Sequence, residues 1–157
     1  MPGVGKSTVG VILAKEIGYE FVDSDLLIQK RKKRLLHEII EDEGTDGFLK
    51  IEEDVNASIE TEHSVIATGG SVVYGQRAMA HLKDIATVVY LKLDYEDLSK
   101  RLGNLHNRGV VLKDGQTLKD IYDERCALYE KYADVVVDEK GRDIEATLEL
   151  VRQKIQQ

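Results

Sequence analysis

The chain of 157 residues carries 22 lysines and arginines against 29 aspartates and glutamates, which gives a net charge of −7. This length suits one domain with its own core, and the acidic balance argues against a nucleic-acid-binding protein, because a phosphate backbone needs a basic face. No stretch reaches the ~18 apolar residues of a membrane span. Cys126 is the one cysteine, which excludes an intramolecular disulfide and is typical of a reducing compartment. We therefore expect a cytoplasmic monomer with neither nucleic acid nor membrane as a partner.

The first recognisable motif is a phosphate-binding loop at residues 3–8, Gly3-Val4-Gly5-Lys6-Ser7-Thr8. Gly5, Lys6 and Ser7 fill the last three positions of the pattern G-x-x-x-x-G-K-[ST], whose first glycine would fall one residue before Met1. In such a loop, glycines let backbone N–H groups turn toward phosphate oxygens. The lysine places a positive charge near the β- and γ-phosphates, and the serine hydroxyl can bind Mg²⁺. The pattern predicts binding of a nucleoside triphosphate, and the alternative is a chance glycine-rich turn.

Residues 6–17 are predicted to form a helix that begins within this loop. Apolar residues recur there at helical spacing, and Gly18 closes the segment. The apolar positions are Val9, Ile12, Leu13 and Ile17. The N-terminus of such a helix adds unpaired amides and a dipole directed at the phosphates, which strengthens the interpretation of the loop.

A phosphate-binding loop normally follows a central, buried strand. Only Met1 and Pro2 precede this loop, so we expect the first strand of the sheet to be missing from the chain. The hypothesis is that the natural chain starts ~6–10 residues earlier, one strand's length. The alternative is a compromised domain with a rearranged sheet.

Beyond Gly18, strand-like and helix-like segments alternate to the end of the chain. Short apolar runs predict strands at 19–22, 65–67, 86–93 and 135–137. Helical spacing predicts helices at 26–30, 35–40, 48–59, 95–102, 118–132 and 144–155, with a break around Gly44 to Gly47. This alternation predicts an α/β fold, a doubly wound parallel sheet flanked by helices, with ligands at the carboxyl ends of the strands. We expect a single domain over residues 1–157.

Further motifs follow the loop in a fixed order. They are Phe21-Val22-Asp23-Ser24-Asp25, Phe48-Leu49-Lys50-Ile51-Glu52, Thr68-Gly69-Gly70-Ser71, Arg108-Gly109-Val110-Val111-Leu112, and the series Arg125, Tyr129, Ala133, Asp134. Together with G-K-[ST], this order resembles the shikimate kinase family of P-loop kinases, which shows D-x-D, F-R-x-x-E, T-G-G-G, R-P-L-L and R-x-x-x-Y-x-x-x-A-D. The resemblance runs from the first residues to the last helix. It implies an enzyme that transfers a phosphoryl group from ATP to a hydroxyl of a small polyhydroxy acceptor.

The resemblance also implies a nucleotide site. Its residues would be Gly3, Val4, Gly5, Lys6, Ser7, Thr8 and Arg101. Ser7 and Asp23 would hold Mg²⁺, Asp23 through water. Lys6 and Arg108 would stabilise the charge on the transferred group, with Arg108 carried by a lid over about 103–116. Arg101, seven residues before Arg108, matches the adenine-stacking arginine of the family.

The acceptor site is implied in the same way. Asp25 would hydrogen-bond the acceptor hydroxyl and receive its proton. Gly69 and Gly70 would let the backbone approach the substrate, and Arg125 would pair with the substrate's carboxylate.

Most of these residues also have a purely structural interpretation. Asp23 and Asp25 could form a strand-end turn in which Asp25 caps the next helix. Gly69 and Gly70 could be a tight turn, Arg108 a solvated residue, and Arg125 a surface partner of its acidic neighbours. The basic run at residues 30–34 is interpreted as a solvated helix end rather than a polyanion patch.

The acceptor half departs from the family pattern. Leu49 stands where the family has an arginine that grips the shikimate carboxylate, and an uncharged side chain cannot form that pair. Ser71 replaces the third glycine, Gly109 replaces the lid proline, and Glu52 loses its arginine partner. These changes lead to the hypothesis that the acceptor is a small polyhydroxy compound that need not be shikimate.

Two classes of function remain open. A kinase is favoured, because a mere nucleotide binder has no need for the acceptor aspartate and the lid arginine, Asp25 and Arg108. A nucleotide-binding protein without useful kinase activity is the alternative, which the missing strand and the altered acceptor site favour. A gluconate-kinase-like or nucleotide-kinase-like enzyme fits the D-x-D spacing less well.

Overall fold

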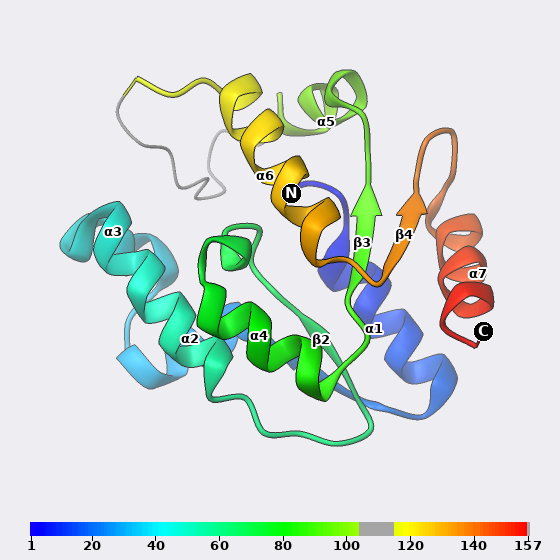
Figure 1. The fold of residues 1–157 in the computed structure, drawn as a ribbon, viewed down its shortest axis with the longest axis horizontal. Coiled ribbons are helices and arrows are strands. Elements are labelled where there is room, and N and C mark those ends of the chain that lie inside the picture. Colours follow the sequence, from blue (N-terminus) through cyan, green and yellow to red (C-terminus); the bar gives the residue numbers. More distant parts are fainter. Residues whose placement is uncertain (104–114, 157) are drawn as a thin grey trace.

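The computed structural model describes residues 1–103 and 115–156, and its helices and strands alternate as the sequence predicts (Figure 1). The first half contains α1 (Lys6–Ile17), β1 (Glu20–Asp23), α2 (Ser24–Lys32), α3 (Leu36–Ala57) and β2 (Ser64–Ala67). A short 3₁₀ turn, η1 (Val72–Tyr74), leads into α4 (Gln76–Ile85), β3 (Val89–Lys92) and α5 (Tyr95–Leu102). The chain ends with α6 (Leu118–Tyr132), β4 (Val135–Asp138) and α7 (Ile144–Ile155).

Three helices with a side-chain cap, α5, α6 and α7, have the bounds that the sequence predicts, whereas α2, which also has a side-chain cap, covers Ser24–Lys32 and exceeds the predicted 26–30. Asp94, Thr117 and Asp143 each accept a hydrogen bond from a backbone N–H in the first turn of α5, α6 and α7, respectively. Such a cap satisfies an amide that would otherwise lack a partner and fixes where the helix begins. The predicted break in α3 is also observed, because Gly44 has φ 70° and ψ 179° inside it.

The segment around residues 76–93 differs more clearly from the prediction. Residues 76–85 form α4, an additional helix that was absent from the predicted elements, although Ala78, Met79 and Leu82 are buried on one side of it. The strand predicted over 86–93 is shorter, with β3 limited to Val89–Lys92. The residues before β3 connect to α4 instead of extending the ladder.

The four strands form two parallel pairs. β1 pairs with β2, with Phe21 opposite Val65, and β3 pairs with β4, with Tyr90 opposite Val136. Within residues 1–103 and 115–156, no strand joins β2 to β3. Helix α1 packs on β1 and β2 and also contacts α7, which in turn covers β4. The predicted parallel α/β fold is thus observed, with its strands in two separate pairs.

Two hydrophobic clusters form the core. The larger one surrounds α1 and β3 and contains, among others, Val9, Leu13, Met79, Leu91, Leu98 and Val137. The smaller one, Ile28, Ile39, Phe48 and Val55, lies between α2 and α3. The second cluster fixes α2 and α3 against each other, and α3 also packs against α4. These helices position the residues that follow β1 and β2.

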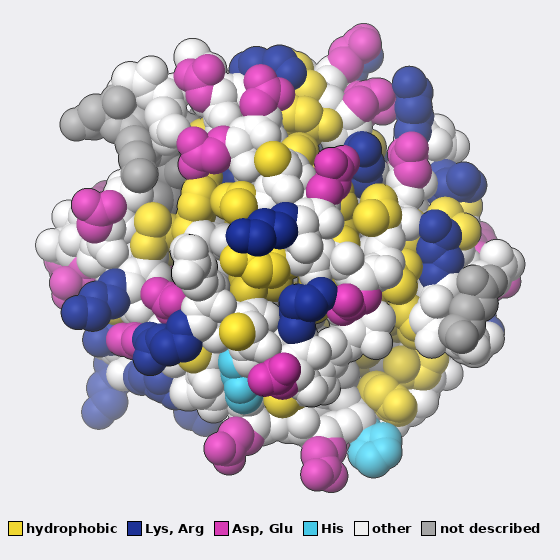
Figure 2. Space-filling view, viewed as in Figure 1, with side chains coloured by type: hydrophobic (Ala, Val, Ile, Leu, Met, Phe, Trp, Pro, Cys, Tyr) yellow, Lys and Arg dark blue, Asp and Glu magenta, His cyan; other side chains and the backbone are white. Residues whose placement is uncertain are grey.

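Acidic and basic side chains are interspersed on the face of the molecule shown in Figure 2. The basic run at residues 30–34 ends α2, where Arg34 pairs with Asp42 at 2.7 Å and with Glu43 at 3.2 Å. This placement agrees with a solvated helix end. In the part of the chain that the structure describes, no helix combines the length and apolarity needed to cross a membrane.

Candidate active site

The loop at residues 3–8 is shaped by glycines with left-handed backbone. Gly3 has φ 81° and Gly5 has φ 83°, a region that glycine adopts without the steric cost paid by other residues. Gly5 is the N-cap of α1 and provides no side-chain hydrogen bond, and the first turn contains no acidic residue. The first amides of α1 therefore remain available to an anion, which supports the predicted phosphate-binding role.

Lys6 provides the cation of the loop. Its Nζ donates a hydrogen bond to the carbonyl oxygen of Met1 at 2.6 Å. Burial lowers the pKa of Lys6 to about 8, and the negative charge of Asp25 opposes this shift. A bound polyphosphate would likewise favour the charged lysine, because an opposite charge nearby stabilises the cation.

The remaining loop residues have different surroundings. Ser7 and Thr8 are exposed in the first turn of α1, whereas Val4 is 2% exposed and belongs to the core. Arg101, an exposed residue of α5, directs its Nη1 to the carbonyl oxygen of Gly3 at 3.4 Å. The structure therefore brings Arg101 beside the phosphate-binding loop, across 98 residues of sequence.

Asp23 ends β1 and caps α2. Its Oδ1 accepts hydrogen bonds from the N–H groups of Asp25 at 2.9 Å and Leu26 at 3.2 Å. The capping residue is thus Asp23 rather than Asp25. Among the described residues, Oδ2 of Asp23 has no hydrogen-bond partner, so one carboxylate oxygen remains for a further role. A carboxylate and a serine hydroxyl are hard oxygen ligands that suit Mg²⁺, which keeps several waters and uses few protein ligands.

We expect two variants of Asp23 to separate its two roles. Asp23→Ala removes the cap and should lower the free energy of unfolding by about 1 kcal/mol. Asp23→Asn preserves the cap, because asparagine is an equally good N-cap, but it should raise the Mg²⁺ concentration needed for half-maximal turnover. Urea unfolding and a magnesium titration of ADP release measure the two effects. Equal loss of stability in both variants would contradict the assignment.

Asp25 and Glu52 converge on the backbone of Gly69. A methyl group placed on Gly69 would lie 2.7 Å from Glu52 Oε2 and 3.1 Å from Asp25 Oδ1. Gly69 is not among the glycines with positive φ, so a side chain at this position would displace the two carboxyl groups and would not strain the backbone. Burial and the neighbouring Asp23 raise the pKa of Asp25, while Lys6 opposes the shift.

Glu52 is buried on α3, with 1% of its surface exposed. Its Oε1 accepts a hydrogen bond from Ser71 Oγ at 2.6 Å, and its Oε2 has no hydrogen-bond partner among the described residues. Burial raises its pKa to about 7, with a further contribution from Asp25, while the hydrogen bond from Ser71 opposes the shift. Glu52 is therefore partly protonated near neutral pH, which reduces the repulsion between the two carboxyl groups.

The raised pKa of Glu52 makes stability depend on pH. Its ordinary pKa is 4.5, so folding favours the protonated form; this contribution is complete below that value and is lost as the pH rises through about 7. Glu52→Gln should therefore reduce the loss of unfolding free energy between about pH 5 and about pH 8.5 by on the order of 1–3 kcal/mol. Urea unfolding at both pH values measures the effect. Glu41→Gln, an exposed site on the same helix, is the control, and an unchanged pH dependence in Glu52→Gln would refute the assignment.

Arg125 and Tyr129 approach Gly70 from α6. A methyl group on Gly70 would lie 3.2 Å from Arg125 Nη1 and 3.2 Å from Tyr129 Oη, and that hydroxyl donates to the Gly70 carbonyl oxygen at 2.6 Å. Arg125 is 2% exposed, so it is not the surface partner of its neighbours that the structural interpretation allows. Its guanidinium carbon lies 5.5 Å from the centre of the Tyr74 ring. The buried cation is placed where it could meet a carboxylate.

Several residues that shape this site have no role predicted from the sequence. Ser71 was noted only as a departure, yet it holds Glu52. Tyr74 lies against Arg125. Glu139 is 4% exposed, and burial raises its pKa, which the charges of Arg101, the N-terminus and Lys6 oppose. Its position directly after β4, at a carboxyl end of the sheet, was the available signal.

The candidate site therefore lies at the carboxyl ends of the strands. Asp25 follows β1, Gly69 and Gly70 follow β2, and Lys6 lies in the loop beside them. The predicted lid over about 103–116 falls largely outside the described residues, and Arg108 with it. The described part combines an anion-binding helix N-terminus and a cation with a pair of carboxyl groups and a buried arginine.

Comparisons with known proteins agree with this arrangement. A family model described as shikimate kinase matches residues 2–156. The chain is 34% identical over 145 residues to shikimate kinase 2 of Yersinia pseudotuberculosis serotype O:3 (strain YPIII), covering 87% of this chain and 81% of that protein. It is 39% identical over 140 residues to the shikimate kinase of Thiobacillus denitrificans, covering 87% and 76%.

Solved structures give the same result. The structure of shikimate kinase from Acinetobacter baumannii in complex with shikimate matches with a TM-score of 0.82 at 31% identity, covering 98% of this chain and 86% of that one. Shikimate kinase from Aquifex aeolicus matches with a TM-score of 0.81 at 27% identity, covering 99% and 92%.

Proposed function

We propose that this chain, which belongs to the shikimate kinase family, transfers the γ-phosphoryl group of ATP to a hydroxyl of shikimate, giving ADP and shikimate 3-phosphate. Membership of the family makes it a small-molecule kinase that acts on a hydroxyl group. The observation that carries the proposal is the convergence of Asp25, Glu52 and Arg125 on Gly69 and Gly70, next to the lysine of a phosphate-binding loop.

The nucleotide would bind at the N-terminus of α1. Backbone amides after Gly5 would receive its phosphate oxygens, and Lys6 would neutralise charge on the transferred group. Ser7 and Asp23 would hold Mg²⁺, which would neutralise phosphate charge when bound. Arg101, at the edge of the loop, would cover the adenine. Arg108 would add a second cation from the lid, a role that rests on the family resemblance alone.

Asp25 would act on the acceptor. The acceptor oxygen forms its bond to phosphorus as the bond to the ADP oxygen breaks, and the hydroxyl proton passes to Asp25 Oδ1 or Oδ2. Phosphoryl transfer has a loose transition state, so the proton moves late and positioning matters more than base strength. Burial raises the pKa of Asp25, which suits a group that must finally hold the proton.

The carboxylate of shikimate would pair with Arg125. A buried arginine offers two parallel N–H donors to a carboxylate, which gives strong and oriented binding. The structural relative from Acinetobacter baumannii holds shikimate, and the sequence relatives are named shikimate kinases. These comparisons favour shikimate over a different polyhydroxy acceptor. Because Leu49 replaces the arginine that the family has at this position, Arg125 would hold the carboxylate without that second arginine.

Restoring that arginine should strengthen acceptor binding. Leu49 is half-buried and lies three residues before Glu52 on α3, so the two side chains share a helix face. Leu49→Arg should therefore lower the KM for shikimate by roughly tenfold, because one charged hydrogen bond contributes about 1.5–3 kcal/mol. Leu49→Met is the control for side-chain length. A steady-state assay in which both variants have the parental KM would show that the acceptor pocket has diverged beyond this residue.

The proposed function is tested by ADP release. Mg·ATP is supplied with shikimate, with gluconate, with other polyols, or with no acceptor. Turnover that requires shikimate and magnesium supports the proposal. Turnover with another polyol but not with shikimate would show that this polyol is the acceptor. Nucleotide binding without acceptor-stimulated turnover would show that the protein binds nucleotide without acting as a kinase.

A further inference from the structure

Ser71 joins the segment that follows β2 to a buried carboxyl group on α3. Ser71 is the residue before η1, directly after Gly69 and Gly70, and 5% of its surface is exposed. Its Oγ donates a hydrogen bond to Glu52 Oε1 at 2.6 Å, across 19 residues of sequence. Because Glu52 Oε2 has no hydrogen-bond partner among the described residues, the carboxyl group of Glu52 is anchored through Oε1.

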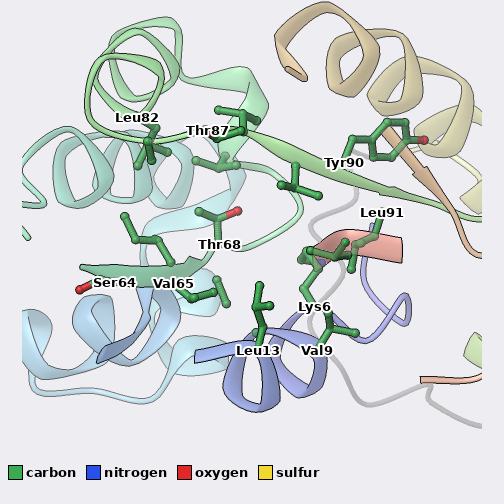
Figure 3. A pocket seen from close by; sticks show the side chains of 18 of the residues that line it. Lys6, Val9, Leu13, Ser64, Val65, Thr68, Leu82, Thr87, Tyr90 and Leu91 are labelled. Atoms are coloured by element: carbon green, nitrogen blue, oxygen red, sulfur yellow. The ribbon is translucent and has the colours of Figure 1, made fainter. Parts of the chain in front are cut away.

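The segment from Gly69 to Ser71 lies between a cavity and helix α3. In Figure 3, Thr68, which comes just before Gly69, is labelled at this cavity; Gly69 and Gly70 also line it, whereas Ser71 is not part of the lining. Ser71 instead precedes η1, which packs against α3. The hydrogen bond from Ser71 to Glu52 therefore ties the segment after β2 to α3.

Glu52 meets Asp25 at the backbone of Gly69. A methyl group on Gly69 would lie 2.7 Å from Glu52 Oε2 and 3.1 Å from Asp25 Oδ1, so oxygens of both carboxyl groups approach one position, from α3 and from α2. A glutamate side chain has several rotatable bonds and is ordered only where contacts hold it. The anchor at Oε1 thus determines whether Oε2 stays against Gly69 or turns toward Asp25.

The charges around Glu52 increase the effect of losing this anchor. They come from three elements: Asp25 of α2, Lys6 of α1 and Arg125 of α6. Burial and Asp25 raise the pKa of Glu52 to about 7, whereas the hydrogen bond from Ser71 and the two cations oppose this rise. Without the Ser71 hydroxyl, Glu52 would more often be a neutral carboxylic acid, which can donate a hydrogen bond to a neighbouring carboxylate.

We propose that Ser71 is a positioning residue of the acceptor site and acts on Asp25 through Glu52. Its hydroxyl holds the Glu52 carboxyl group against Gly69. Without this hydroxyl, Glu52 turns toward Asp25 and donates a hydrogen bond to the carboxylate oxygen that the acceptor hydroxyl needs. The inference rests on the proposed function, in which the acceptor hydroxyl binds Asp25. Glycine, which the family motif has at this position, could not perform this role because it has no side chain.

Two substitutions of Ser71 separate this role from simple packing. Ser71→Ala should raise the KM for shikimate by roughly tenfold, the effect of losing one hydrogen bond to a charged group, and should change kcat and the KM for ATP by less than about threefold. Ser71→Thr retains the hydroxyl and should have the parental KM. Ser64→Ala, at the opposite end of β2, is the control for loss of a serine hydroxyl.

A second anchor for Glu52 should make Ser71 dispensable. Leu49 precedes Glu52 by three residues on the same face of α3, and an arginine there could hold the carboxylate. In the Leu49→Arg background, Ser71→Ala should therefore raise the KM for shikimate by less than about twofold. An equal increase in both backgrounds would show that Ser71 does not act through Glu52 and would overturn the proposal.

Carbon-13 NMR of the Glu52 carboxyl group tests the anchor without turnover, with Glu52→Gln used to assign the signal. The pKa of Glu52, about 7 in the parent, should rise in Ser71→Ala and keep the parental value in Ser71→Thr. No rise in Ser71→Ala, or a parental KM for shikimate in that variant, would overturn the proposal and leave the proposed function intact. Absence of shikimate turnover in the parent would overturn the proposed function and this inference with it.

Discussion

Lys6→Met should lower kcat for acceptor phosphorylation by roughly 10³-fold or more, which is the effect of removing one preorganised donor from a transition state. Lys6 is the only cation in the sequence of the loop itself, and in the proposed nucleotide site the γ-phosphoryl group would lie in front of the first turn of α1. Methionine retains the apolar stem of lysine but cannot stabilise that charge. The loss should fall on kcat more than on the KM for shikimate, because the proposed partner of Lys6 is the nucleotide and not the acceptor.

The matched control is Lys15→Met, an exposed lysine on the same helix. This variant should keep parental kinetics. Coupled measurement of ADP release at about pH 7, below the lowered pKa of Lys6, keeps the lysine charged in the parent. Activity within a few-fold of the parent in Lys6→Met would show that residues 3–8 do not hold the transferred phosphate.

Asp25→Asn should lower kcat by on the order of 10²–10⁴-fold, the usual contribution of a positioned acid–base group. Asparagine has the same shape and can accept a hydrogen bond from the acceptor hydroxyl, but it cannot retain the proton. The dissociation constant for Mg·ATP, measured by calorimetry without acceptor, should change little, because Asp23 and not Asp25 provides the predicted magnesium ligand.

Asp46→Asn is the control for loss of one acidic charge, since Asp46 is exposed on α3. It should leave kcat unchanged. Far-ultraviolet circular dichroism verifies that Asp25→Asn is folded. If Asp25→Asn is folded and has the parental kcat, Asp25 takes no part in the reaction. Its carboxyl group would then have only a structural role beside Gly69.

The elements that could be predicted from the sequence are those with local signals. α5, α6 and α7 have a capping side chain and helical spacing, and their bounds matched. α4 lacks a capping side chain: its N-cap is Gly75, which provides no side-chain hydrogen bond, and it follows directly after η1. Its apolar residues Ala78, Met79 and Leu82 do recur at helical spacing, so the periodic signal for this helix was present in the sequence and only the signal for its start was missing.

The candidate site could also be predicted only in part. The phosphate-binding loop is contiguous, so residue type and spacing were enough to predict it. The acceptor side depends on residues far apart in sequence, and spacing alone could not place the buried Glu52 against Gly69. The hydrogen bond from Ser71 to Glu52 turns an apparent departure from the family motif into a structural contact. Leu49 could be identified as unusual, but its effect on acceptor binding depends on Arg125, which approaches from α6.

The division of the sheet into two halves affects which measurement would detect a destabilising substitution in this protein. Asp25, Glu52 and Gly69 belong to the half that contains β1 and β2, whereas Arg101 and Arg125 come from helices that flank β3. The groups proposed to bind nucleotide and acceptor therefore stay aligned only while the two halves keep their relative orientation, so the rate of turnover would depend on that orientation. A substitution at that junction, remote from the acceptor, will abolish turnover while circular dichroism still reports intact helices.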